Sequence, residues 1–277
     1  MIFDSHAHYD DKQFAEDRVG LLSSMGEHNI GKIVNVGASI ESSKHSMMLA
    51  EKYDFIYAAI GVHPSDISCL STRSFAWLKK AAGHEKVVAI GEIGLDYYWD
   101  KEEEVQEQQK MWFRRQLALA REVELPVIIH SRDAAADTME VIKEDAENRK
   151  RKSGSITDPD GRDQEPVPVP GVIHCFSYSK EQAMEYVKMG YYIGVGGVVT
   201  FKNAKKLKEV VTEVPPEKIV IETDCPYLAP EPNRGKRNSS LYLPYVIEEI
   251  ARIKDMSPRE VEEITFSNAE KLYGISM

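Results

Sequence analysis

Two histidines lie two residues apart near the start of the chain, in the segment MIFDSHAHYD. The apolar run that leads into them favours a β-strand, and alternate side chains of a strand share one face. We therefore expect Ile2, Asp4, His6 and His8 to point the same way. Such a face presents two imidazoles, which are frequent ligands of divalent metal ions.

Further histidines and carboxylates close other short apolar runs. His63, His130 and His174 each end such a run, and Glu92 and Asp224 end two more. A lone histidine at the end of a buried strand is usually a hydrogen-bonded structural group. Here, however, five of the eight histidines fall at predicted strand ends, which favours a metal site.

The number of candidate ligands indicates more than one metal ion. One open catalytic site commonly uses three protein ligands and a water. Four histidines and two carboxylates exceed that number, and a carboxylate can bridge two cations. We therefore expect two divalent ions. For His63, in GVHP, the pattern allows either a structural hydrogen bond or a contact with substrate.

The elements that must position these residues are eight short apolar runs, which alternate with stretches of helical periodicity. The runs are MIFDSH, KIVNVG, IYAAIGVHP, KVVAIGEIGLD, PVIIH, GVIHCF, YYIGVGG and KIVIETDCP. Strands that are apolar on both faces and joined by helices indicate a parallel sheet, and eight such units predict a (β/α)8 TIM barrel. The carboxyl ends of barrel strands form one mouth, where all the candidate ligands would meet. An open doubly wound sheet is the main alternative, but neither a phosphate loop nor a GxGxxG motif opens the first helix.

Length and composition are compatible with one domain over residues 1–277, because α/β barrels routinely reach this size. The segment at about 147–168 is charged and rich in Gly, Pro, Ser and Asp, which predicts an exposed insertion. After residue 241 we expect two or three closing helices, with Ser257 as an N-cap before Pro258.

Several function classes are disfavoured by the composition. No apolar stretch approaches the length of a membrane span. Three cysteines without CxxC spacing indicate reduced thiols and a cytoplasmic protein, and we expect Cys175 and Cys225 to pack as small hydrophobic groups outside the barrel. A net charge of −10 argues against a protein that coats nucleic acid through bulk electrostatics.

The candidate residues stand in an ordered set of motifs, namely DSHAH, GVHP, GEIGLDYY, FRRQLALA, LPVIIHSRDA, HCFS and ETDCPYLAPEPNRGKRN. This set resembles the TatD family of metal-dependent hydrolases, within the amidohydrolase superfamily, over nearly the whole chain. The resemblance implies a (β/α)8 fold and deoxyribonuclease activity, in several members as a 3′-to-5′ exonuclease on single strands. It also implies metal ligation by His6, His8, Glu92, His130, His174 and Asp224.

The resulting hypothesis assigns one cation to His6, His8, Glu92 and Asp224, and a second to Glu92, His130 and His174. The catalytic residues would be Glu92, which bridges the ions, and Asp224, which would also accept a proton from the attacking water. Glu222 would hydrogen-bond to one of the metal ligands and orient it, without contacting the metal itself. Histidine-rich ligation favours Zn or Mn, whereas Mg often supports the family's nuclease activity, so the identity of the metal stays open.

The predicted substrate is single-stranded DNA or a DNA 3′ end. Arg132 is a candidate phosphate ligand because a guanidinium can bind phosphate through two hydrogen bonds. His63, Tyr97 and Arg234 are further candidate contacts. The basic loop NRGKRN also contains Lys236 and Arg237 as candidate phosphate contacts. A terminal base of the substrate could stack on the rings of Tyr97, Tyr98 or Phe176.

Two alternatives remain open. The same ligand set would serve amide or ester hydrolysis of a small molecule or an aminoacyl-tRNA. A barrel that binds metal but acts only as a binding module is a third possibility. The chain also departs from the family pattern after the basic loop, where residues 238–240 read Asn-Ser-Ser instead of continuing with Glu-Pro.

Overall fold

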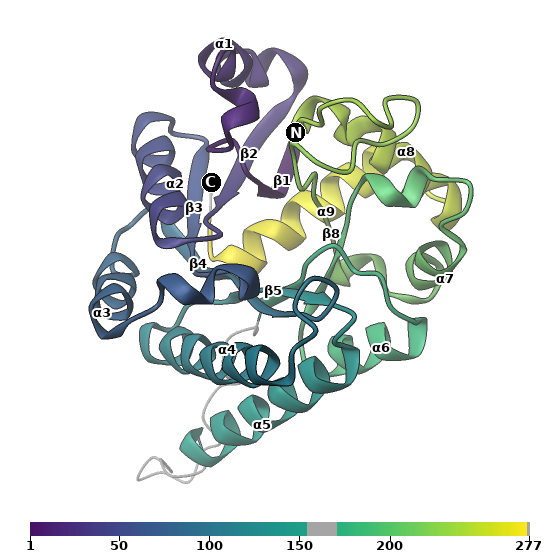
Figure 1. Cartoon of the computed structure of the whole chain (residues 1–277). Helices are drawn as coiled ribbons and strands as arrows, with labels where there is room; N and C mark the ends of the chain where they lie inside the picture. Colours follow the sequence, from purple (N-terminus) through teal and green to yellow (C-terminus); the bar gives the residue numbers. More distant parts are fainter. Residues whose placement is uncertain (154–170, 276–277) are drawn as a thin grey trace, which may run out of the picture.

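The eight predicted apolar runs form eight parallel strands in the part of the chain that this computed structural model describes, residues 1–153 and 171–275 (Figure 1). The strands are β1 Ile2–Ala7, β2 Ile30–Val36, β3 Ile56–Ile60, β4 Val87–Asp96, β5 Val127–Arg132, β6 Gly171–Ile173, β7 Tyr192–Val195 and β8 Ile219–Ile221. Each strand pairs in parallel with the next, so the order in the sheet is the order in the sequence. The predicted (β/α)8 TIM barrel is confirmed.

Residues that follow β8 join the two ends of the sheet. Ala7 and Cys225 form a parallel bridge. The carbonyl of His6 accepts hydrogen bonds from the backbone amides of Thr223 and Asp224. The segment that carries Asp224 is therefore bonded directly to the strand that carries His6.

Helices surround the barrel as a ring (Figure 1). Their bounds are α1 Arg18–Ser23, α2 Ile40–Lys52, α3 Thr72–Ala81, α4 Glu103–Val123, α5 Ala135–Ser153, α6 Lys180–Lys188, α7 Lys205–Glu213, α8 Leu243–Lys254 and α9 Pro258–Tyr273. The closing helices predicted after residue 241 are α8 and α9. Ser257 caps α9 as predicted, because its hydroxyl accepts from the Glu260 amide and the Glu260 carboxylate accepts from the Ser257 amide.

The strand residues alternate between two apolar environments. Ile33 and Ile193 belong to the main core that the surrounding helices share. Their neighbours Val34 and Tyr192 belong to a second cluster inside the barrel, to which every strand contributes. Helix α9 adds Phe266 and neighbouring residues to this inner cluster and crosses the middle of the ring in Figure 1.

Helix α9 packs at the amino-terminal side of the barrel interior. The ring of Phe3, near the start of β1, lies 5.8 Å from the ring of Phe266 and 6.0 Å from that of Tyr273, between centroids. The opposite end, formed by the carboxyl ends of the strands, is left for polar groups.

The predicted insertion at about 147–168 falls mostly outside the described residues. Residues 147–153 continue α5, and residues 154–168 lie beyond the described part of the chain. Within residues 1–153 and 171–275, no helix combines the length and apolar character needed to cross a membrane.

Candidate metal centre

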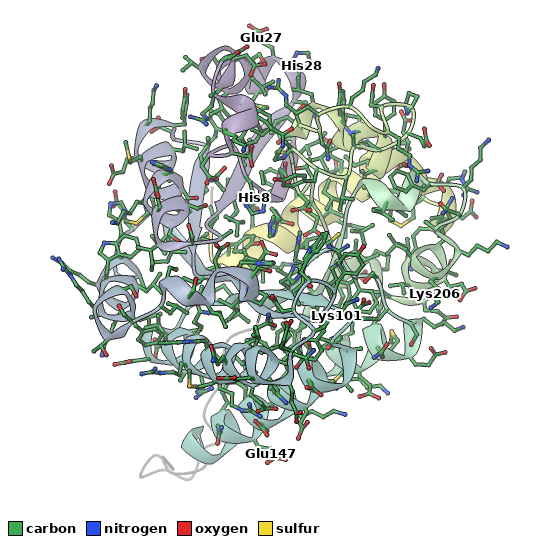
Figure 2. All side chains as sticks on the ribbon, in the orientation of Figure 1. His8, Glu27, His28, Lys101, Glu147 and Lys206 are labelled. Atoms are coloured by element: carbon green, nitrogen blue, oxygen red, sulfur yellow. The ribbon has the colours of Figure 1, made fainter. Side chains whose placement is uncertain are left out.

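All six predicted ligands lie in the second half of a barrel strand or within three residues after its end. In chain order they are His6 in β1, His8 after β1, Glu92 in β4, His130 in β5, His174 after β6 and Asp224 after β8. Figure 2 places His8 near the centre of the ring of helices. Strands that are far apart in sequence thus deliver these side chains to one place.

Asp4 does not join the two imidazoles, contrary to the expectation from strand alternation. The register of β1 against β2 shifts just after Asp4, where three residues of β1 advance against two of β2. The Asp4 carboxylate instead accepts from the hydroxyls of Thr223 and Ser240, at 2.7 and 2.6 Å. Ser240 belongs to the Asn-Ser-Ser run that departs from the family pattern, and here it secures the segment after β8.

One oxygen of Glu92 faces His6 and His8. The Nε2 atoms of the two histidines lie 3.0 Å apart, and they lie 3.6 and 3.7 Å from Glu92 Oε2. Asp224 Oδ1 lies 3.8 Å from His6 Nε2 and 3.4 Å from His8 Nε2. Two imidazoles and two carboxylates thus converge on one point.

The other oxygen of Glu92 faces a second group of histidines. Glu92 Oε1 lies 2.8 Å from His130 Nδ1, 3.8 Å from His63 Nε2 and 3.9 Å from His174 Nε2. Asp224 Oδ1 also lies 3.7 Å from His174 Nε2. Glu92 therefore lies between the two groups, with one oxygen toward each.

Backbone groups fix the tautomers of two of these histidines. His8 Nδ1 lies 2.8 Å from the Val36 carbonyl, which can only accept, so Nδ1 carries a hydrogen and, once the ring is neutral, Nε2 has the lone pair that faces the site. His63 has the opposite arrangement, because its Nδ1 accepts from the Ser65 amide at 3.2 Å. In neutral His63 the hydrogen is therefore on Nε2, which can donate a hydrogen bond but cannot ligate a metal.

Carboxylates orient two more of the five histidines. Asp96 Oδ2 lies 3.1 Å from His130 Nε2, and Glu222 Oε1 lies 3.1 Å from His174 Nδ1. Glu222 also accepts from the Cys175 amide. Such carboxylate–histidine pairs are typical partners behind metal ligands, because they fix the ring and raise its basicity.

The two carboxylates that face the histidines are ionised. Burial alone would raise the pKa of Glu92, but hydrogen bonds from His130 and His6 outweigh it and hold the pKa well below its usual range. Burial opposes ionisation of Asp224 too, yet the hydrogen bond from His8 lowers its pKa.

The histidines divide into protonated and neutral members. Burial lowers the pKa of His8, but Asp224 raises it to about 9 overall. For His174, burial is likewise outweighed by the charge of Glu222, and the pKa rises to about 10. His63 is the opposite case, because burial lowers its pKa to about 4.

The donor set fits divalent cations. Imidazole nitrogen and carboxylate oxygen are ligands of Zn and Mn, and the ligand atoms within each of two groups lie within 4.8 Å of one another. One group is His6, His8 and Asp224. The other is His63, Glu92 and His130, in which His63 presents Nε2–H and leaves Glu92 and His130 as the ligands. Bound cations would replace the protons that now balance the carboxylates.

Cys175 does not pack outside the barrel, so that expectation is wrong. Its ligand atom lies within 4.8 Å of those of His174 and Asp224. Strand alternation no longer applies there, because β6 ends at Ile173 and Cys175 has a left-handed backbone with φ of 45°. Cys225 is fully buried in the main core, as a small hydrophobic group.

The candidate substrate contacts after β4 and β5 differ in solvent exposure and in whether they already have a hydrogen-bond partner. Arg132 is exposed, and its guanidinium carbon lies 3.9 Å from the centre of the Tyr98 ring. The Tyr97 hydroxyl donates to Asp137 in α5 at 2.7 Å, so this side chain bridges two elements. Phe176 is buried and is not available as an open stacking surface.

The basic loop after β8 also divides into free and paired cations. Arg234 is exposed and lies over the Phe201 ring, 4.3 Å from its centre. Lys236 donates to Asn233. Arg237 forms an ion pair with Asp17, through two hydrogen bonds of 2.9 and 2.5 Å.

Two features of the mouth were missed by reasoning from the sequence. A cavity of about 330 Å³ opens beside Cys175 and Phe176, and α7 lines its far side. Gly194 and Gly196 line this cavity too, and no sequence pattern predicted it. The second feature is Trp99, which is 67% exposed in the loop after β4.

Comparisons with known proteins agree with this geometry. The family described as TatD related DNase matches residues 3–274. The uncharacterized metal-dependent hydrolase YabD of Bacillus subtilis is 45% identical over all of both chains. The protein named 3′-5′ ssDNA/RNA exonuclease TatD of Cronobacter sakazakii is 30% identical, over 98% of this chain and 97% of its own.

A solved structure extends the agreement to three dimensions. The crystal structure of YJJV, a TatD homologue from Escherichia coli K12, matches with a TM-score of 0.85 at 30% identity, and the match covers 99% of this chain and 98% of that one. Sequence and fold therefore agree over the full described chain, and the protein belongs to the TatD family of metal-dependent hydrolases.

Proposed function

We propose that this hydrolase cleaves phosphodiester bonds of DNA, as a 3′-to-5′ exonuclease on single strands that uses two divalent metal ions. The observation that carries the proposal is the division of Glu92, whose Oε2 faces His6 and whose Oε1 faces His130. A carboxylate between two groups of imidazoles suits a pair of cations, and paired cations are common in nucleases. The name of the Cronobacter relative supports a single nucleic acid strand as the substrate.

The proposed ligands form two sets that share Glu92, and His174 Nε2 lies between them, 3.9 Å from Glu92 Oε1 and 3.7 Å from Asp224 Oδ1. His6, His8, Glu92 and Asp224 would hold one ion, and Glu92 with His130 and His174 would hold the other. The imidazole-rich set favours Zn or Mn over Mg. When bound, the cations supply Lewis acidity, which lowers the pKa of a water molecule and polarises the phosphoryl oxygens.

Asp224 is the proposed acceptor of the proton from the attacking water. Its carboxylate is ionised because the hydrogen bond from His8 offsets burial. The side chain is 19% exposed, against 5% for Glu92, so it is the more accessible of the two carboxylates. Glu92 is the proposed bridging residue.

His63 is proposed as a hydrogen-bond donor to the substrate. Its Nδ1 is occupied by the Ser65 amide, and its low pKa keeps the ring neutral at pH 7. Nε2–H then points toward the site, 3.8 Å from Glu92 Oε1. A phosphoryl oxygen beside Glu92 would accept this hydrogen bond.

The proposed phosphate contacts are Arg132, the last residue of β5, and Arg234, in the loop after β8, and both are exposed. Their charges suit the strand that leads away from the scissile bond. Tyr97 would contact the substrate through the edge of its ring, because its hydroxyl is already hydrogen-bonded to Asp137.

A second candidate function is hydrolysis of an amide or ester in a small molecule or an aminoacyl-tRNA. The cavity of about 330 Å³ beside Cys175 favours it, because a pocket of this size suits a small ligand. The exposed arginines favour the phosphodiester over this alternative.

The test is a time course of metal-reconstituted protein on 5′-labelled single-stranded DNA. We expect a ladder that shortens from the 3′ end and that is absent with EDTA and in His130→Ala. If protein shown to hold metal leaves the DNA intact with Mg, Mn and Zn, the phosphodiesterase proposal is wrong, and ester and amide substrates take its place.

A further inference from the structure

The loop after β4 exposes two large aromatic side chains. Trp99 is 67% exposed, more than any other large hydrophobic side chain in the described residues, and Tyr98 is 44% exposed. Their rings meet edge to face, with centroids 4.7 Å apart. The two rings thus form one contiguous exposed apolar surface, and such surfaces are typical of binding sites.

The backbone of this loop is fixed even though its rings are exposed. Asp96 Oδ1 accepts from the amides of Tyr98 and Trp99, at 3.0 and 3.3 Å. Gln109 of α4 accepts from the Asp96 amide and donates to the Asp100 carboxylate, at 2.9 and 2.7 Å. The two rings are therefore presented by an anchored loop.

A cation completes the surface. The guanidinium carbon of Arg132 lies 3.9 Å from the centre of the Tyr98 ring and 5.6 Å from that of Trp99. Aromatic faces beside an arginine are the combination with which proteins bind unpaired nucleic acid strands, because bases stack on the rings and phosphates pair with the cation. We call Tyr98, Trp99 and Arg132 the Trp99 platform.

The platform adjoins the candidate metal centre through one carboxylate. Asp96, whose Oδ1 holds the platform's backbone, places Oδ2 3.1 Å from His130 Nε2. Arg132 follows His130 by two residues in β5. A strand with its scissile phosphate at the metal centre would thus have a neighbouring base at the platform.

We infer that the Trp99 platform stacks an unpaired nucleobase of the substrate, next to the nucleotide that is cleaved. This inference rests on the proposed function and deepens it, because stacking on an exposed ring selects an unpaired base over one held in a duplex. The ring face of Trp99 provides the stack, and Arg132 binds the adjoining phosphate.

The test compares two ligands of equal length and charge on the metal-loaded full-length protein. One is a short phosphorothioate oligothymidylate, checked by gel to stay intact, and the other is its abasic counterpart. We expect wild type to bind the oligothymidylate about 5- to 150-fold more tightly, the range for loss of one base–aromatic stack. Trp99→Ala should remove this difference, and Trp99→Tyr should keep most of it.

Fluorescence gives an independent readout. The oligothymidylate should quench the emission of wild type, and Trp99→Tyr, which retains Trp77 and Trp112, should lose the quenching while it still binds. Tyr245→Ala, which removes an exposed ring from α8, is the matched control and should behave as wild type.

The outcomes separate the two proposals. If wild type cleaves DNA but Trp99→Ala retains the full preference for bases over abasic sites, the platform is wrong and the proposed function stands. If wild type neither binds nor cleaves the DNA strand, both are wrong.

Discussion

Asp96 Oδ2 lies 3.1 Å from His130 Nε2, so the last residue of β4 holds a candidate metal ligand of β5 by its outer nitrogen. Because a carboxylate only accepts, His130 donates from Nε2 to Asp96 and, in the metal-free protein, from Nδ1 to Glu92, 2.8 Å away; a bound cation would take the place of the Nδ1 hydrogen. The same carboxylate caps the loop that exposes Trp99. One side chain thus couples the orientation of a proposed ligand to the surface beside it.

Asp96→Asn should weaken metal binding by about 10- to 100-fold, the usual effect of losing a carboxylate behind a histidine ligand. The amide keeps an oxygen for the loop amides, but it places a donor against His130 Nε2–H. Metal titration by calorimetry measures the effect. Asp100→Asn is the matched control, because Asp100 lies in the same loop and contacts Gln109 instead of a histidine. Equal affinities for the two variants would contradict this role.

Glu92→Gln should lower the metal content from two ions to one or none. The amide retains one oxygen, but its NH₂ group cannot ligate, so one of the two groups loses its shared carboxylate. Activity on single-stranded DNA should fall at least about 100-fold, because both ions contribute to the reaction. Elemental analysis of dialysed protein gives the stoichiometry. A variant that retains two ions would show that Glu92 does not bridge them.

Metal affinity should rise with pH between 6.5 and 8.5. In the metal-free protein the pKa of His8 is about 9 and that of His174 about 10, so both hold protons at pH 7. Metal binding must displace those protons, and the displacement becomes easier as pH approaches the two pKa values from below. Calorimetry in buffers of different ionisation enthalpy measures the protons released. His8→Gln should release about one proton fewer, and an affinity that does not change with pH contradicts the assignment.

The sequence predicted the fold well because strand and helix periodicity persists along the chain. All eight apolar runs are strands, and the histidines and carboxylates at their ends converge. The failures lie where the backbone leaves regular structure. Asp4 precedes a register shift in β1, and Cys175 has a positive φ, so alternation misplaced both side chains.

Long-range pairing explains the remaining errors about the mouth. Arg237 reads as a phosphate ligand in NRGKRN, but it pairs with Asp17, which lies 220 residues away in sequence. The exposure of Trp99 depends on how Gln109 and Asp96 fix the loop, and no local pattern reports that arrangement.

Arg234→Ala should weaken binding of single-stranded DNA. It should also reduce the slope of the logarithm of the binding constant against the logarithm of the salt concentration by about one, the contribution of one phosphate contact. Arg234 is exposed and has no carboxylate partner among the ion pairs of the described residues. Arg237→Ala is the matched control. The Arg237 guanidinium already pairs with Asp17, so this substitution should leave the slope unchanged. Fluorescence anisotropy over a range of salt concentrations measures both. Identical slopes for Arg234→Ala and wild type would remove Arg234 from the substrate contacts.

Gly194→Ala should destabilise the protein and weaken metal binding together. A Cβ at Gly194 would lie 2.7 Å from Glu222 Cδ, and Glu222 is buried and holds both the Cys175 amide and His174. The carboxylate must move, so we expect a loss of about 1–3 kcal/mol in the free energy of unfolding, as for other overpacked sites. Gly20→Ala in α1 is the control, because a Cβ there meets nothing within 4 Å and alanine favours a helix. Urea unfolding and metal titration measure the two effects. If Gly194→Ala keeps wild-type stability and affinity, Glu222 is free to shift and does not position His174.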